Sequence, residues 1–306
     1  MRQYLVQLVC CLIVLPAAVS SHADTLKERY SRFDSQIKAV MFTDIADARK
    51  VDAIAATFQQ FHPEPITRER IKDLANDDLM LLLRATNDAS FYGRDVGYVK
   101  QMLIVTEHLI VKKTITADQI KYQYDTFVRV RLFDDAQRWH KRFPTAAKTT
   151  LPTLIDDATI KSGEPSEWVI AADARVATRR RVDLNCDWMM VVVSHPLCGP
   201  SGRATKAIYA DAALANRLKG RTKWVTPQDS NITIEIFQQL NIDYPDAPVS
   251  VVHIANEWPL EKFSSTPIFY FLREGKVVES FSGWPKEGNF EKLNAALDRL
   301  AFVGAR

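Results

Sequence analysis

Apolar residues recur at helical spacing throughout residues 25–142. Leu26, Tyr30, Phe33 and Ile37 stand at positions i, i+4, i+7 and i+11, the spacing of one face of an amphipathic helix. Thr67 and Thr116 are suitable N-terminal caps for later helices. The short segments HPEP, NDAS, KKTITAD and RFP separate the periodic stretches, which predicts antiparallel helical hairpins. The further stretches with this periodicity cover about 45–61, 67–75, 77–86, 95–112, 116–130 and 133–142.

The stretch YQYDTFVRVRLFDDAQRWHKRFP resembles the end of a tetratricopeptide-type repeat, in which a second helix ends near a proline. The chain has no clear self-similarity at a period of 34 residues, the length of such a repeat. A plain helical bundle is therefore the favoured interpretation of residues 24–142, and a repeat domain is the alternative.

The residue composition and the hydrophobic periodicity of the sequence change after residue 142. Residues 143–166 are rich in Thr, Pro and Ser without a sustained period, which predicts a linker. Residues 167–184 alternate like a β-hairpin, and WMMVVVS is a continuous apolar run of the buried-strand type. Strands and helices then alternate, which indicates an α/β sheet. The expected elements are strands at 188–194, 222–227, 247–254, 268–273 and 276–282, with helices at 200–218, 231–240 and 287–301.

Length and charge limit the possibilities. A chain of 306 residues is long enough for two domains, and its 47% hydrophobic and 25% charged residues are typical of a globular protein. A net charge of +3 gives no electrostatic reason to expect nucleic acid. The basic run at residues 179–181 is interpreted as a solvated strand edge, with a phosphate site as the alternative.

Residues 1–23 have the pattern of a signal peptide. A short basic start precedes an apolar core of about 15 residues, and SHA places small residues before Asp24. A retained membrane anchor is the alternative, but the apolar run is shorter than the ~20 residues of a spanning helix and contains Pro16. We therefore expect a periplasmic or secreted protein with no stable membrane span after cleavage. Its remaining cysteines are Cys186 and Cys198.

The order of elements, with Cys-Gly-Pro at the first strand-to-helix junction, resembles the thioredoxin-like superfamily over about residues 185–302. VVVSHPLCGPS places Cys198 after a buried strand and at a helix start. SSTPIFYFLREGKVVESFSGW resembles the later hairpin of the family, and NFEKLNAALDRL its final helix. The resemblance implies that Pro267 is a cis-proline facing Cys198. Cys198 and Pro267 stand farther apart than in a minimal thioredoxin, and an insertion at 241–262 accounts for the difference.

The candidate chemistry centres on Cys198. A helix N-terminus favours the thiolate, which is the nucleophilic form of a cysteine. Ser201 stands where a dithiol thioredoxin has its resolving cysteine; its hydroxyl can donate a hydrogen bond to the thiolate but cannot displace a disulfide. A strand at 189–194 spans about 16 Å at roughly 3.3 Å per residue. Cys186 is thus too far from Cys198 for a disulfide, which needs Cα atoms within about 7 Å.

Two further positions bear on this chemistry. The family often has an acidic residue six positions before the cysteine, and here that position is Val192. His195 is a candidate modifier of the Cys198 pKa if it is charged, or else a solvent-exposed loop histidine. Two alternatives are weaker: a metal site formed by His195, Cys198 and His253, and a peroxidase. We therefore expect neither a metal nor a cofactor.

The sequence thus predicts a multidomain chain with an all-α helical domain followed by an α/β thioredoxin-like domain. The predicted function is thiol–disulfide exchange through Cys198, with Ser201, Pro267 and His195 at the site. The expected partners are protein thiols or disulfides, or small thiols such as glutathione, and a protein bound by the helical domain. The alternative is a binding or scaffold protein that has lost catalysis. The expected boundaries are 1–23 for the signal peptide, 24–142 for the helical domain, 143–166 for the linker and 167–306 for the thioredoxin-like domain.

Overall fold

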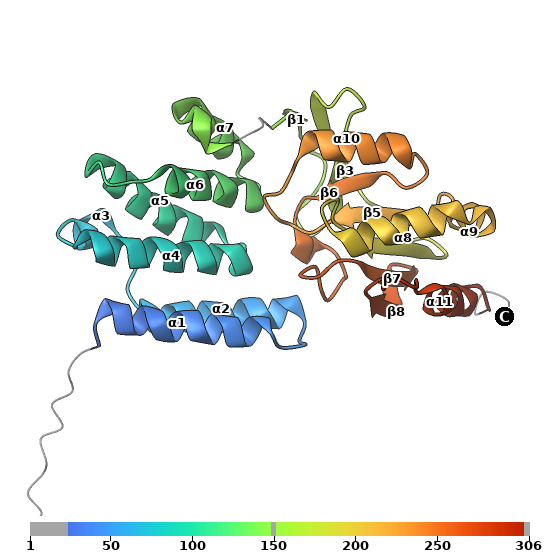
Figure 1. Cartoon of the computed structure of the whole chain (residues 1–306), viewed down its shortest axis with the longest axis horizontal. Helices are drawn as coiled ribbons and strands as arrows, with labels where there is room; N and C mark the ends of the chain where they lie inside the picture. The colour runs from blue at the N-terminus through green and yellow to red at the C-terminus, as the bar shows by residue number, and fades with distance from the viewer. Residues whose placement is uncertain (1–23, 148–150, 303–306) are drawn as a thin grey trace, which may run out of the picture.

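The computed structural model describes residues 24–147 and 151–302, which form a helical half followed by a half built on one mixed sheet (Figure 1). The signal peptide expected at residues 1–23 lies outside the described residues. In Figure 1 the helices of the first half are stacked beside the α/β half. These helices are α1 (Leu26–Met41), α2 (Asp47–Phe61), α3 (Arg68–Ile71), α4 (Asn76–Gly93), α5 (Val96–Val111), α6 (Ala117–Arg129) and α7 (Phe133–Arg142).

Side-chain caps fix where several helices begin. Thr25 and Thr116 each accept from the backbone N–H three residues on, and the side chains of Glu28 and Gln119 return a hydrogen bond to complete a capping box. Thr67 caps α3 in a similar way, as its position predicted. The apolar stripe of α1 packs into a core with α2, α4 and α5.

One expected break between helices is wrong. The segment NDAS was expected to end a helix near residue 86, but α4 continues to Gly93. Ala89 and Ser90 are fully buried, so packing outweighs the low helix propensity of the polar residues around them. Arg94 ends the helix with a left-handed backbone conformation, φ 53°.

The second half contains eight strands among the described residues, in the order β1-β3-β2-β6-β5-β4-β7-β8. β4 pairs parallel with β5 and antiparallel with β7, so the sheet is mixed. The strands are β1 (Thr153–Ile155), β2 (Ser166–Ile170), β3 (Val176–Arg181), β4 (Met189–Val193), β5 (Thr222–Thr226), β6 (Val249–Val252), β7 (Ile268–Arg273) and β8 (Lys276–Ser282). The helices of this half are α8 (Gly199–Ala210), α9 (Ala212–Leu218), α10 (Ile234–Asp243) and α11 (Phe290–Phe302), with the 3-10 turns η1 (Pro144–Ala146) and η2 (Ala255–Glu257).

The expected linker contributes to the sheet. Residues 153–155 form β1, which pairs parallel with β3 in the register Thr153↔Val176. A strand of three residues is too short to show a period in the sequence, which is why residues 143–166 resembled a linker. The single helix expected at 200–218 is divided at Asp211, whose side chain accepts from the backbone N–H of Leu214 and starts α9.

The two faces of the sheet are covered differently. Met190 and Val192 point to the face covered by helices, including α8, α10 and α11. Val191 and Val193 point to the other face, because side chains alternate along a strand. That second face is covered by Trp258, Leu260 and Phe263, which lie within or just after the insertion expected at 241–262. Much of the insertion thus completes the core.

The helical half and the sheet share one hydrophobic core. Phe127 and Trp139 from the helices belong to the same buried cluster as Trp224 and Phe269 from the strands. Phe133 packs edge-on against Trp168 of β2, with ring centroids 5.4 Å apart. The helical half is therefore held in a fixed place against the sheet.

Candidate functional site

Cys198 is the N-cap of α8, one loop beyond the fully buried strand β4. Its backbone N–H donates to the carbonyl of His195 (2.9 Å), and its carbonyl accepts from the N–H of Gly202 (3.0 Å). Pro200 stands in the first turn, where its missing N–H costs no helical hydrogen bond. This geometry holds the sulfur at the positive end of a helix dipole.

The Thr266–Pro267 peptide is cis, and Thr266 lies next to Cys198. The thiol of Cys198 donates to the carbonyl oxygen of Thr266 over 3.3 Å. Pro267 directly precedes β7, the antiparallel neighbour of β4. Val193 faces Ile268 across these two strands, so the loop of Cys198 and the Thr266–Pro267 pair lie at the same end of the sheet.

The surroundings of Cys198 favour its thiolate. Burial raises the pKa of Cys198, but hydrogen bonds from Ser201 and from the Thr266 side chain, together with the charge of Arg203, outweigh it and lower the pKa. Ser201 is almost completely buried, and its hydroxyl also accepts from the backbone N–H of His195 (3.4 Å). Ser201 therefore fits the role of thiolate donor.

His195 is held in one orientation beside this loop. Its Nδ1 accepts from the backbone N–H of Leu197 (3.1 Å), so the proton of a neutral ring is on Nε2. Nε2 lies 3.4 Å from a carboxylate oxygen of Asp229. The His195 side chain is 12% exposed, so the alternative of a freely solvated loop histidine does not hold.

Asp229 belongs to this site although no sequence pattern pointed to it. It follows β5, the parallel neighbour of β4, and the carboxyl ends of parallel strands meet at one edge of a sheet. Its second carboxylate oxygen accepts from the backbone N–H of Asn231 (2.9 Å). Asp229 thus lies beside His195 because two strand ends meet, although Nε2 of His195 has no hydrogen-bond partner among the described residues.

Cys186 lies at the opposite end of β4 from Cys198. It precedes the strand, and its carbonyl accepts from the N–H of Glu274, which follows β7 (2.9 Å). Both cysteines are free thiols, and burial raises the pKa of Cys186. The geometry agrees with the expectation that Cys186 does not pair with Cys198.

A cavity of about 390 Å³ lies between the helical half and the sheet, and Cys198 opens onto it. His195, Asp229 and Thr266 line it from the sheet side. Asp47, Arg94 and Arg129 line it from the helical side. Its volume falls within the range of small-molecule sites, about 300–1,000 Å³.

Hydrogen bonds between the two halves fix the walls of this cavity. The carboxylate of Asp47 accepts from the backbone N–H of Phe263 (2.7 Å) and from the hydroxyl of Ser264 (2.8 Å). The amide of Gln228 donates to the carbonyl of Arg129 (3.0 Å). These contacts hold the cavity at the end of the sheet where Cys198 and Thr266 meet.

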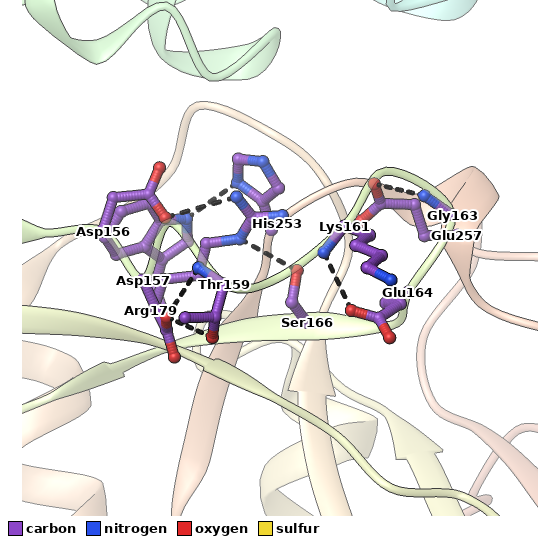
Figure 2. A network of polar contacts seen from close by, with 11 residues as sticks. Asp156, Asp157, Thr159, Lys161, Gly163, Glu164, Ser166, Arg179, His253 and Glu257 are labelled. Atoms are coloured by element: carbon purple, nitrogen blue, oxygen red, sulfur yellow. Dashed lines mark hydrogen bonds and ion pairs between the residues drawn. The ribbon is translucent and has the colours of Figure 1, made fainter.

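The basic run at residues 179–181 lies on a different part of the sheet. Figure 2 shows Arg179 beside Asp156 and Ser166; its guanidinium is 3.3 Å from Asp156 and donates to the Ser166 hydroxyl over 3.1 Å. Arg181 pairs with Glu164 at 3.5 Å. Acidic partners hold two of its arginines, which argues against a phosphate site. The expected solvated strand edge does not describe Arg179, whose side chain is 10% exposed on a strand between β1 and β2.

His253 lies in the same region and not at the cavity with Cys198 (Figure 2). Its Nδ1 accepts from the indole N–H of Trp168 (3.0 Å), and burial with the charges of Arg179 and Arg131 lowers its pKa to about 4. Within residues 24–147 and 151–302, no group of three or more His, Cys, Asp or Glu side chains is placed to hold a metal ion. The three-residue metal site weighed from the sequence is thus not assembled.

Comparisons with known proteins identify no relative, so the function of the site is inferred from its geometry. No protein-family model, curated protein or solved structure matches this chain. None of the helices in the described part of the chain is long and apolar enough to cross a membrane.

Proposed function

We propose that this protein is an exported, thioredoxin-like thiol–disulfide exchange protein that works through the single thiol of Cys198. The observation that carries the proposal is the N-cap position of Cys198 next to Thr266 of the cis peptide, with a lowered pKa and an opening to a cavity. The element order supports the thioredoxin-like interpretation of the second half: a cysteine follows the first central parallel strand, and a cis-proline precedes an antiparallel one.

The proposed reaction has two balanced steps. The Cys198 thiolate attacks one sulfur of a substrate disulfide, which forms a mixed disulfide and releases the other half as a thiolate. An external thiolate then attacks the mixed disulfide at the substrate sulfur, which restores the Cys198 thiolate and forms a new disulfide. No net oxidation occurs, so no further oxidant or reductant is required.

The second step needs an external thiol because no second cysteine of the described residues lies near Cys198. Ser201 occupies the position three residues after Cys198, and Cys186 lies at the other end of β4. His195 lines the same cavity wall, with its Nε2 3.4 Å from a carboxylate oxygen of Asp229.

The test uses a neutral probe, bis(2-hydroxyethyl) disulfide, with the Cys186→Ala protein. We expect mass spectrometry of the native protein to show one probe adduct on Cys198, which excess 2-mercaptoethanol removes. Cys198→Ala is the matched control and should form no adduct at that position. If native Cys198 forms no adduct while the urea-unfolded protein does, exchange is wrong and the binding or scaffold alternative takes its place.

A further inference from the structure

Three arginines meet where the helical half contacts the sheet, and one of them has a complete set of partners. Arg131 is buried, and its guanidinium donates to the carbonyls of Val128, Asp229, Val252 and His253 over 2.7–3.2 Å. Arg131 therefore joins the helical half to the sheet and has a structural role.

Arg129, by contrast, lacks hydrogen-bond acceptors for part of its guanidinium. It is only 6% exposed, yet its Nε and Nη1 are buried without a hydrogen-bond partner among the residues that the structure describes. The guanidinium lies over the ring of Phe91, 4.4 Å from the ring centre, and borders the cavity. Burial lowers the pKa of Arg129 to about 10. A buried guanidinium without paired donors is costly, so this position fits a site completed by a ligand.

Arg94 and Lys50 increase the positive charge of the same cavity. Arg94 also lines it, and its buried Nε has no partner within the described residues. Burial lowers the pKa of Arg94, and the charge of Arg94 in turn lowers the pKa of Arg129, so the two guanidinium groups are close enough to repel each other. Lys50 is buried at the cavity wall, where its ammonium donates to the carbonyl of Met41.

The two carboxylates on the cavity wall attract the arginines through their charge, since Asp47 and Asp229 raise the pKa of Arg94, but their hydrogen bonds go to other groups. Asp47 accepts from Phe263 and Ser264, and Asp229 accepts from Asn231 and faces His195. Neither forms an ion pair with Arg94 or Arg129, because the ion pairs of the described residues include neither arginine. Arg94 and Arg129 therefore line a cavity of about 390 Å³ without an ion-pair partner among the described residues.

We infer that this cavity binds the carboxylate of a small thiol or disulfide through Arg129 and Arg94, with the sulfur of that molecule directed to Cys198. The inference rests on the proposed function, because it identifies the class of external thiol. A guanidinium binds a carboxylate through two parallel hydrogen bonds, which would satisfy buried donors of Arg129.

The arginines are better assigned to a ligand than to the Cys198 thiolate. The cation whose charge lowers the pKa of Cys198 is Arg203, which lies on α8 and donates to the carbonyl of Trp284. Arg129 ends α6 in the helical half. A molecule that bridges the cavity would thus contact Arg129 at its carboxylate and Cys198 at its sulfur.

The test separates anion binding from redox chemistry. S-methylglutathione, which has carboxylates but no free thiol, and its diethyl ester are titrated into the Cys198→Ser protein by calorimetry. We expect the acid to bind about 10- to 100-fold more tightly than the ester, the range for hydrogen bonds to a charged group. Arg129→Gln should bring this ratio close to one, and Arg129→Lys should give an intermediate ratio. Arg138→Gln is the matched control and should keep the full ratio, because Arg138 is exposed on α7.

The outcomes distinguish the two proposals. Equal binding of acid and ester by the Cys198→Ser protein, or a ratio unchanged in Arg129→Gln, overturns the carboxylate site even if Cys198 exchanges with a neutral disulfide. A large ratio that depends on Arg129 supports the site even if Cys198 proves unreactive. The comparison of acid and ester needs no arginine variant, so it stands if Arg129→Gln does not fold.

Discussion

The backbone N–H of Phe263 donates a 2.7 Å hydrogen bond to the carboxylate of Asp47, from the loop that covers the second face of the sheet to the first turn of α2. The same carboxylate accepts from Ser264, two positions before Thr266. This pair of contacts connects the helical half to the segment that carries the cis peptide beside Cys198. The shape of the cavity thus depends on Asp47.

Replacing Asp47 tests this connection. Asp47→Ala leaves the N–H of Phe263 without its acceptor, so we expect the free energy of unfolding to fall by about 1.5–3 kcal/mol in urea titrations. Asp44→Ala is the matched control. Asp44 contacts Lys262 in the same loop, but its side chain is 95% exposed, so its loss should lower the free energy of unfolding clearly less than the loss of Asp47. Equal costs for the two variants would contradict the role given to Asp47.

The position of Ser201 gives a second prediction. In Ser201→Cys the introduced thiol stands three residues after Cys198 in the first turn of α8, where it can attack a mixed disulfide on Cys198. In a Cys186→Ala background, we expect the variant to expel a bound 2-hydroxyethylthiol probe and form an internal disulfide, whereas the protein with Ser201 retains the adduct. Mass spectrometry distinguishes the two products. A stable adduct in the variant would show that the proposed geometry of resolution is wrong.

His253 makes the stability of the fold depend on pH. Its pKa is about 4 in the folded protein, below the ~6.5 of an exposed histidine, so the unfolded chain binds more protons between these values. The contribution of neutral His253 is complete above pH 6.5 and is lost as the pH falls toward 4. It amounts to about 2 kcal/mol, allowing for the partial exposure of the ring.

The His253→Gln variant isolates that contribution. Glutamine keeps an acceptor for the indole N–H of Trp168 but does not titrate in this range. We expect the loss of unfolding free energy between pH 6.5 and 4 to be smaller in the variant than in the parent. Parallel curves for the two proteins would mean that His253 is not the group responsible.

Those features of the site that depend on local sequence could be predicted. A continuous apolar run before Cys-Gly-Pro indicates a buried strand followed by a helix, and the structure has β4 and α8 there. The aromatic and aliphatic run after Pro267 likewise became β7. Where packing decided the outcome, as in the continuation of α4 through NDAS, local polarity gave the wrong boundary.

The charged wall of the cavity could not be predicted in this way. Arg129 stands at the end of an amphipathic helix, where an arginine is usually solvated, and it is buried here because α6 packs against other elements, including Phe91 of α4. Asp229 has no pattern of its own and meets His195 because β4 and β5 are parallel neighbours. Their roles depend on contacts between segments far apart in the sequence.

The measurement that tests the central claim most directly is the pH dependence of thiol alkylation in the native protein. Iodoacetamide rates are measured for Cys198 in Cys186→Ala and for Cys186 in Cys198→Ala. Hydrogen bonds from Ser201 and Thr266 lower the pKa of Cys198, whereas burial raises that of Cys186. The proposed function predicts that Cys198 titrates below the ~8.5 of a free cysteine and that Cys186 titrates above it. A Cys198 that titrates at or above 8.5, or that does not react in the folded protein, would contradict it.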